Sequence, residues 1–174
     1  MVTTPVQATD LKGLRRVIDL SGKTVAWLTL LMVLLTFSIV ILRYGFNLGW
    51  IWLQEILIYF HVTVFTIGAA WTLQQNGHVR VDIFYADMPA KKRALIDLLG
   101  TLFFLMPFCI FLLVIALPYV AGSWKLLEGS REAGGLPLVF LLKSLILVLP
   151  ALLLGQAVIN TTDALKTLRG NGDN

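Results

Sequence analysis

The 174-residue chain is strongly hydrophobic and basic, with 57% hydrophobic residues, 14% charged residues and a formal net charge of +4. Soluble domains usually carry about a quarter charged residues, so this composition excludes an ordinary soluble domain and indicates an integral membrane protein. Its one cysteine, Cys109, excludes an internal disulfide and a thiolate metal cluster. The net charge reflects an uneven spread of basic residues and does not indicate nucleic-acid binding.

The segment before the first apolar run is polar and basic. No small-residue cleavage site follows that run, so we expect no cleaved signal peptide. Apolar residues recur in this segment at helical spacing beside basic ones, in the order Leu11, Lys12, Leu14, Arg15, Arg16, Val17 and Ile18. The pattern predicts a short amphipathic helix lying on the anionic cytoplasmic surface of the membrane, the alternative being a solvated basic tail.

Four apolar runs follow, each near or above the roughly 20 residues that cross a hydrocarbon core. We place them at residues 25–42, 51–73, 94–121 and 136–159. Nothing outside them is long enough to fold separately. The sequence therefore predicts an all-α integral membrane protein with four transmembrane helices and a single membrane domain, residues 1–174.

The basic residues fall mainly on one side of these runs. Ten of the 14 Lys and Arg residues lie before the first run, between the second and third, or after the fourth. The opposite side holds Arg43, Lys125, Arg131 and Lys143. The positive-inside rule therefore predicts a multi-pass membrane protein with both termini in the cytoplasm.

Signatures of catalysis are missing from the sequence. It contains no HExxH, CxxC or GxSxG motif and no phosphate-cradling glycine loop, so we predict that the chain is not an enzyme and binds no cofactor. A haem-anchor subunit of a respiratory complex is the alternative. Bis-imidazole ligation needs two facing histidines, but only His61 lies at membrane depth while His78 falls in a cytoplasmic loop. A haem would therefore need a ligand from a partner chain.

The second run carries two stripes of polar and small residues. At 100° per residue, one face holds Glu55, Tyr59, Val62, Thr66, Ala69 and Leu73, and a second stripe holds Gln54, His61, Gly68 and Gln75. Such residues let helices approach closely and hydrogen-bond in lipid, so we expect both stripes to pack against neighbouring helices, with His61 donating to one of them. Glu55, Lys143 and Arg43 lie at similar depths near the outer side of the membrane, so we expect Glu55 to pair with Lys143 or Arg43. The alternative is that Glu55 reaches the outer headgroups.

The order of several motifs resembles the small membrane subunit of tripartite ATP-independent periplasmic (TRAP) transporters. The resemblance covers roughly residues 15 to 165. It is carried by Trp52 and Glu55, Gly68-Ala69-Ala70, GHVRVD at Gly77–Asp82, Glu128-Gly129-Ser130, GGLP at Gly134–Pro137, and Lys143-Ser144. Many relatives carry a second acid just before the glutamate, where this chain has Gln54, so a role for two carboxylates is not expected here.

The resemblance implies a role as a scaffold in the bacterial inner (cytoplasmic) membrane. In that family a periplasmic binding protein delivers a small organic anion to a large elevator-type membrane subunit, which holds the sodium and substrate sites. The small subunit packs against the large one, which gives Glu55 a further possible partner in a basic residue of that subunit. The GGLP loop resembles branches that handle keto acids and related carboxylates. A chain that acts alone would need more intramembrane charges than Glu55, His61 and Lys143.

Two connecting segments are candidate contact surfaces. After the second run, we expect Gly77 to end the helix in a left-handed cap and the alternation of residues 79–83 to form an extended segment. Docking of the large subunit there would use Gly77, His78, Arg80 and Asp82, the alternative being an interfacial linker. On the periplasmic side, we expect a surface for the binding protein rather than a solvated turn, formed by Arg43, Lys125, Glu128, Ser130 and Arg131.

Overall fold

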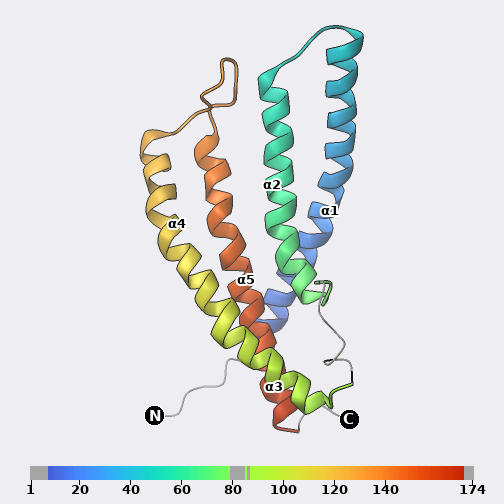
Figure 1. The fold of residues 1–174 in the computed structure, drawn as a ribbon, viewed down its shortest axis with the longest axis vertical. Helices are drawn as coiled ribbons and strands as arrows, with labels where there is room; N and C mark the ends of the chain where they lie inside the picture. The colour runs from blue at the N-terminus through green and yellow to red at the C-terminus, as the bar shows by residue number, and fades with distance from the viewer. Residues whose placement is uncertain (1–7, 79–84, 86, 171–174) are drawn as a thin grey trace.

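The computed structural model describes residues 8–78, 85 and 87–170, and within these residues the regular secondary structure is helical, with no strand. The elements are α1 (Ala8–Gly45), α2 (Ile51–Gln74), α3 (Ala90–Gly100), a π-helical turn η1 (Thr101–Leu105), α4 (Met106–Leu126) and α5 (Val139–Leu168) (Figure 1). Four stretches are long and apolar enough to cross a membrane, namely Lys12–Gly45, Ile51–Gln74, Ala90–Leu126 and Val139–Leu168. The predicted fold of four transmembrane helices is confirmed.

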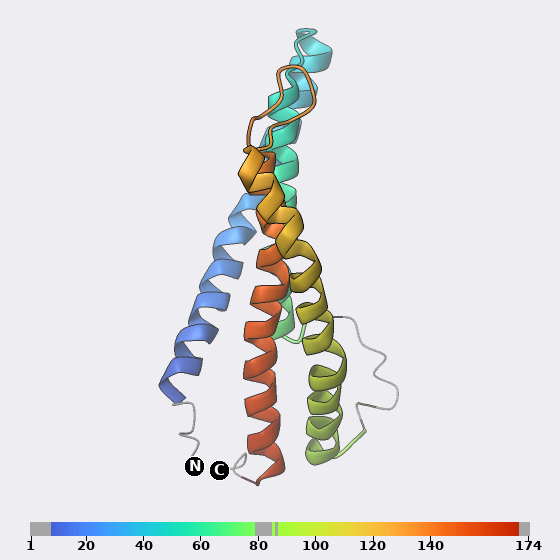
Figure 2. The ribbon, with the colours of Figure 1, turned by 90° about the vertical axis from the view of Figure 1, so that its left-hand side faces the viewer.

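The helices form two hairpins that meet at one end of the molecule. Helices α1 and α2 form one hairpin, α4 and α5 form the other, and α2 contacts α5 between them. Figures 1 and 2 show that the start of α1, α3 and the end of α5 lie together at the lower end. We call this the terminal end, and the opposite end, with the connections at residues 46–50 and 127–138, the loop end.

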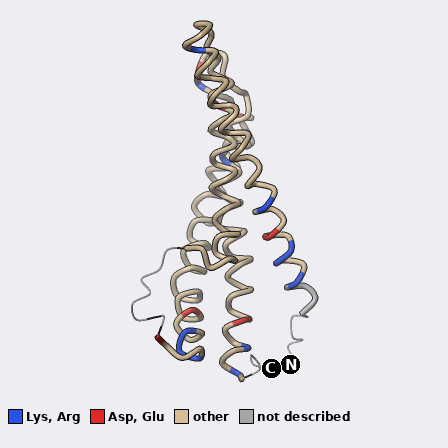
Figure 3. The backbone as a smooth tube through the Cα atoms, turned by 90° about the vertical axis from the view of Figure 1, so that its right-hand side faces the viewer, with Lys and Arg blue, Asp and Glu red and all other residues tan. Residues whose placement is uncertain are grey.

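Charge distinguishes the terminal end. Figure 3 shows Lys and Arg gathered along the start of α1 and near the terminal ends of α3 and α5, while the upper helices are mostly uncharged. This is the side that the sequence predicts to be cytoplasmic. The orientation of the termini stays a prediction, because it depends on the positive-inside rule rather than on the fold.

The amphipathic segment is helical, but it is the beginning of α1 and not a separate surface helix. Ile18 is 1% exposed and packs with Ala70 of α2 and Ile159 of α5. Arg15 of the same segment forms an ion pair with Asp163 of α5. Part of its predicted apolar stripe, Leu14 and Ile18, therefore packs on neighbouring helices, while Val17 is 58% exposed.

Close packing holds α1 against α2 beside this core. Gly22 faces Trp71, and a Cβ at residue 22 would lie 2.6 Å from the Cβ of Trp71. The indole N–H of Trp71 donates to Asp19 Oδ1 at 3.2 Å. Glycine at position 22 thus allows the close approach that brings Asp19 within reach of the indole.

The third membrane span is longer than predicted and contains a π-helical turn. It runs through α3, η1 and α4, from Ala90 to Leu126, instead of 94–121. The π turn ends just before Pro107, which has no N–H to donate and whose ring crowds the preceding turn. An extra residue per turn relieves this crowding without breaking the helix. The fourth span is also displaced from its predicted 136–159, to Val139–Leu168.

The end of α2 is capped by a different residue from the one predicted. Asn76 takes the left-handed conformation, with φ +53°. The N–H of Asn76 donates to the carbonyl of Leu73 at 3.2 Å, and that of Gly77 donates to the carbonyl of Thr72 at 2.9 Å. This is a Schellman motif, in which the left-handed position precedes Gly77. Asparagine tolerates that conformation better than most residues do, so the prediction for Gly77 was one residue late.

Candidate functional site

Glu55, in the second turn of α2, holds the loop between α4 and α5. Its Oε2 accepts the backbone N–H of Leu136 at 2.5 Å, and its Oε1 accepts the hydroxyl of Ser130. The predicted pairing with Lys143 or Arg43 is wrong. Lys143 is bound to Glu128, and Arg43 lies exposed in the last turn of α1. The carboxylate is therefore a tie between the two hairpins at the loop end.

The backbone of this loop brings both donors to Glu55. Leu127 takes a left-handed conformation at φ +45° and ends α4. The N–H of Ser130 then donates to the carbonyl of Leu136 at 2.9 Å, which closes the loop on itself. A Cβ on Gly135 would lie 2.8 Å from Glu55 Oε1 and would also collide with the side chain of Ser130. The second glycine of GGLP is thus required for the carboxylate to enter the loop.

A second carboxylate secures the same loop from the other side. Glu128 Oε2 accepts the Ser123 hydroxyl at 2.7 Å and forms an ion pair with Lys143. The Lys143 ammonium also lies 4.3 Å from the centre of the Tyr119 ring, within the range of a cation–π contact. The hydrogen bond from Lys143, followed by that from Ser123, holds the pKa of Glu128 below its ordinary value. Glu128 is therefore ionised wherever the loop end is near neutral pH.

The residues predicted for the periplasmic surface divide into two groups. Lys125 and Arg131 are exposed, as is Arg43 at the end of α1. Glu128 and Ser130 instead point inward and fasten the loop. Sequence reasoning missed Leu136, because it contributes its backbone N–H, a group that almost every residue type has.

The two stripes of α2 differ in burial. On the Glu55 stripe, Tyr59 is half-buried and Thr66 is 3% exposed, so this stripe packs within the bundle as predicted. His61, on the Gln54 stripe, is exposed. The expected bond from His61 to a neighbouring helix is therefore wrong within this chain, since the His61 side chain is exposed.

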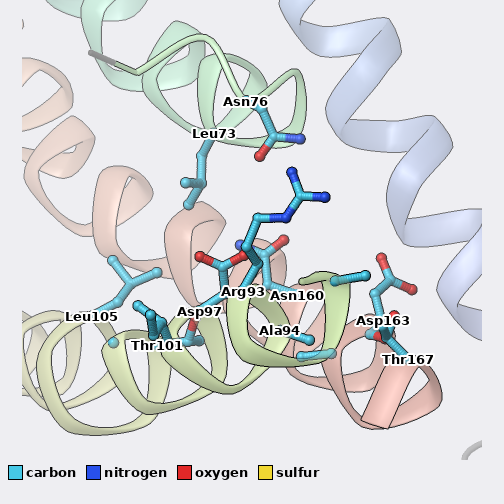
Figure 4. Close-up of a pocket in the computed structure, with 14 residues that line it drawn as sticks. Leu73, Asn76, Arg93, Ala94, Asp97, Thr101, Leu105, Asn160, Asp163 and Thr167 are labelled. Carbon is cyan, nitrogen blue, oxygen red and sulfur yellow. The ribbon is translucent and has the colours of Figure 1, made fainter. Parts of the chain in front are cut away.

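A cavity of about 670 Å³ lies at the terminal end, between the end of α2, α3 and α5. Figure 4 shows Arg93, Asp97 and Asp163 around it. The two acids are already engaged: Asp97 accepts the hydroxyl of Tyr85 at 2.5 Å, and Asp163 pairs with Arg15 of α1. The acidic residues that line this cavity thus link α3 to Tyr85 and α5 to α1.

Only part of the GHVRVD motif falls within the described residues. Gly77 and His78 follow α2 and are exposed. Arg80 and Asp82 lie outside the described residues, as does the predicted extended segment at residues 79–83. The docking role of this motif stays a prediction. Within the described ranges, no group of three or more His, Cys, Asp or Glu side chains could hold a metal ion.

Comparison with known families decides the identity. The sequence model of the family described as tripartite ATP-independent periplasmic transporters, DctQ component, matches residues 32–167, which is well over half of the chain. The chain belongs to the DctQ family. It is a small permease subunit of a TRAP transporter, and the resemblance drawn from the motif order is confirmed.

Two relatives agree with this assignment. The chain is 33% identical over 94 residues to the C4-dicarboxylate TRAP transporter small permease protein DctQ of Vibrio cholerae. It is 31% identical over 94 residues to a Haemophilus influenzae protein provisionally named a TRAP transporter small permease protein. Each match covers 54% of this chain, but only 37% and 53% of the respective relatives. No solved structure gives a significant match.

Membership of the DctQ family settles two of the predictions. The subunit belongs to a transporter and is not an enzyme. It is a multi-pass protein of the bacterial inner membrane, in agreement with its four membrane-spanning helices. The alternative of a respiratory haem anchor finds no support in these comparisons.

Proposed function

We propose that this DctQ-family subunit is the stationary partner of a large elevator-type membrane subunit in sodium-coupled uptake of a small organic anion. The family match carries the proposal, because the family is one component of a tripartite system. The Vibrio cholerae relative is named for C4-dicarboxylates, which supports a carboxylate as the substrate class. A periplasmic binding protein would deliver that anion to the membrane.

The arrangement of charges supports a scaffold without its own transport path. Glu55, Glu128 and Lys143 are all engaged in bonds that fasten one loop to the helices. A carboxylate that must bind and release sodium or a proton would need to be free to exchange partners. We therefore place the sodium and substrate sites on the large subunit and expect no cofactor on this one.

The loop end fits a contact surface for the binding protein. Two carboxylates fix the backbone of residues 128–136, while the side chain of Arg131 at its tip is exposed. A surface fixed before binding loses little entropy when a partner arrives. With the termini in the cytoplasm, this loop lies on the periplasmic side.

Reconstitution in liposomes tests the proposal. The subunit alone should give no substrate uptake under an inward sodium gradient, and uptake should require both the large subunit and the cognate binding protein. The large subunit with the binding protein but without this chain is the matched control, and it should be much less active. Uptake by this subunit alone would overturn the assignment.

A further inference from the structure

One face of α2 points out of the bundle at membrane depth. His61 and Phe65 lie on it, and Phe65 is 64% exposed. At 100° per residue, Gly68 falls on the same face. Thr66 and Ala70, on the opposite face, are 3% and 0% exposed. Within the described chain, the side chains of His61 and Phe65 on this side of α2 are therefore left exposed by the other helices.

This face continues into a groove between α1 and α2. The groove has a volume of about 440 Å³ and is mainly apolar. It is lined by Val25, Ala26 and Thr29 of α1 and by Phe65, Gly68 and Thr72 of α2, among others. A Cβ on Gly68 would meet nothing within 4 Å, so the floor of the groove is open at this point. The groove can accept a side chain from outside.

The depth of His61 indicates what must cover this face. His61 is ten residues from Ile51, where α2 begins, which places it about 15 Å along the helix at 1.5 Å per residue. This is half of a hydrocarbon core of about 30 Å. Acyl chains could fill the groove, but they offer an imidazole neither donor nor acceptor, and an unpaired polar group is costly there. A protein surface is the covering that can pair with it.

We propose that the groove and His61 form the seat of a transmembrane helix of the large membrane subunit. That helix would place a bulky apolar side chain beside Gly68, and a hydroxyl, amide or carboxyl group opposite His61 about two turns nearer the loop end. The imidazole can donate to and accept from such a group. This assignment rests on the proposed function, because it takes its partner from the tripartite system.

Gly68→Leu gives the sharpest test, because a Cβ at this position meets no atom within 4 Å and Gly68 lines the groove. Gly122→Leu is the matched control, since Gly122 on α4 also has nothing within 4 Å of a Cβ. Both variants should be purified with a tagged large subunit. We expect recovery of the Gly68→Leu chain to fall about tenfold or more, equivalent to about 1.4 kcal/mol, with Gly122→Leu at the wild-type level. Wild-type recovery of both variants overturns the assignment.

Two further experiments distinguish the possible causes of a reduced recovery. His61→Phe should also reduce recovery, and His61→Gln should restore much of it, since the amide keeps a donor and an acceptor. A cysteine at position 68, in a chain with Cys109→Ser, should crosslink to the large subunit. Crosslinks between two copies of this chain would overturn the proposal in favour of a self-contact, and no protein crosslink would overturn it in favour of lipid.

The same experiment distinguishes this inference from the proposed function. If the wild-type chain is recovered with the large subunit while Gly68→Leu and His61→Phe are recovered equally well, only the position of the contact is wrong. If the wild-type chain is not recovered with the large subunit under conditions where both fold, the scaffold role itself is wrong, and this assignment fails with it.

Discussion

Glu55 accepts the backbone N–H of Leu136 at 2.5 Å, although the two residues are 81 positions apart in the chain. Glu55 lies in the second turn of the second membrane span, and Leu136 lies just before the fourth. The bond therefore joins the two helical hairpins at the end where their helices are otherwise spread apart (Figure 1). Because the donor is a backbone group, any residue except proline at position 136 can supply it in this loop conformation.

Replacing Glu55 separates its hydrogen bonds from its charge. Glu55→Gln keeps a carbonyl that can accept from Leu136 and an amide that can donate to the Ser130 oxygen, so it should lose only a small part of uptake. Glu55→Leu leaves both donors without an acceptor and should lose most uptake and increase proteolysis within residues 128–136. Uptake assays and limited proteolysis on reconstituted complexes check this. Equal, wild-type-like behaviour of both variants would show that the hydrogen bonds to Glu55 do not hold the two hairpins together.

Gly135→Ala should reproduce the loss seen with Glu55→Leu. The added Cβ would lie 2.8 Å from Glu55 Oε1 and force the carboxylate or the loop to move. Gly134→Asn is the control, because Gly134 has φ +78° and asparagine tolerates that region. Gly135→Ala and Glu55→Leu break the same contact. Their effects on thermal stability should therefore be non-additive in a double-mutant cycle. Fully additive losses would show that Gly135 acts elsewhere.

Acidification should loosen the loop through Glu128. Its pKa is lowered in the folded protein, mainly by Lys143, so the stabilisation is fully present above the ordinary glutamate pKa of about 4.3. It is lost as the pH falls through the lower, folded value. Thermal unfolding in detergent should therefore show a fall in midpoint below about pH 4.3 that is smaller in Glu128→Gln. The variant should be less stable than wild type at pH 7, and an identical pH profile would contradict the ion pair.

At the terminal end, packing should matter more than the ion pair. Ile18 is 1% exposed, and Ile18→Ala leaves a cavity that costs about 2–5 kcal/mol. The side chains of Arg15 and Asp163 are 38% and 48% exposed, so Asp163→Asn should cost roughly 1 kcal/mol or less. Unfolding in graded denaturant would measure both. A larger loss for Asp163→Asn would show that charge holds α1 to α5.

Topology can be tested with reporters and a thiol. Reporter fusions after Gly170 should score as cytoplasmic and insertions within residues 129–135 as periplasmic, because basic residues gather at the terminal end. Cys109 is 0% exposed and lies within the third membrane span, so membrane-impermeant maleimide should not label it from either side. A periplasmic C-terminus would reverse the proposed contact surfaces.

The sequence alone determined the membrane class, the number of spans and the family. These follow from apolar run length, which a helix must satisfy whatever its neighbours are, and from the order of short motifs. The start of α2 was predicted at Ile51, where it is observed. Helical periodicity also found the two stripes of that helix, because a residue's face depends only on its spacing along the chain.

Tertiary structure decided which stripe faces inward and what each charge contacts. Lys143 and Glu55 have similar depths, and a sequence gives depth along a helix but not the angle at which helices pack. Lys143 therefore forms an ion pair with Glu128, while Glu55 accepts the backbone N–H of Leu136. Residue types do not reveal which backbone N–H a side chain will contact. The same reason explains His61: its stripe has the composition of a helix contact, but α5 packs on the other side of α2.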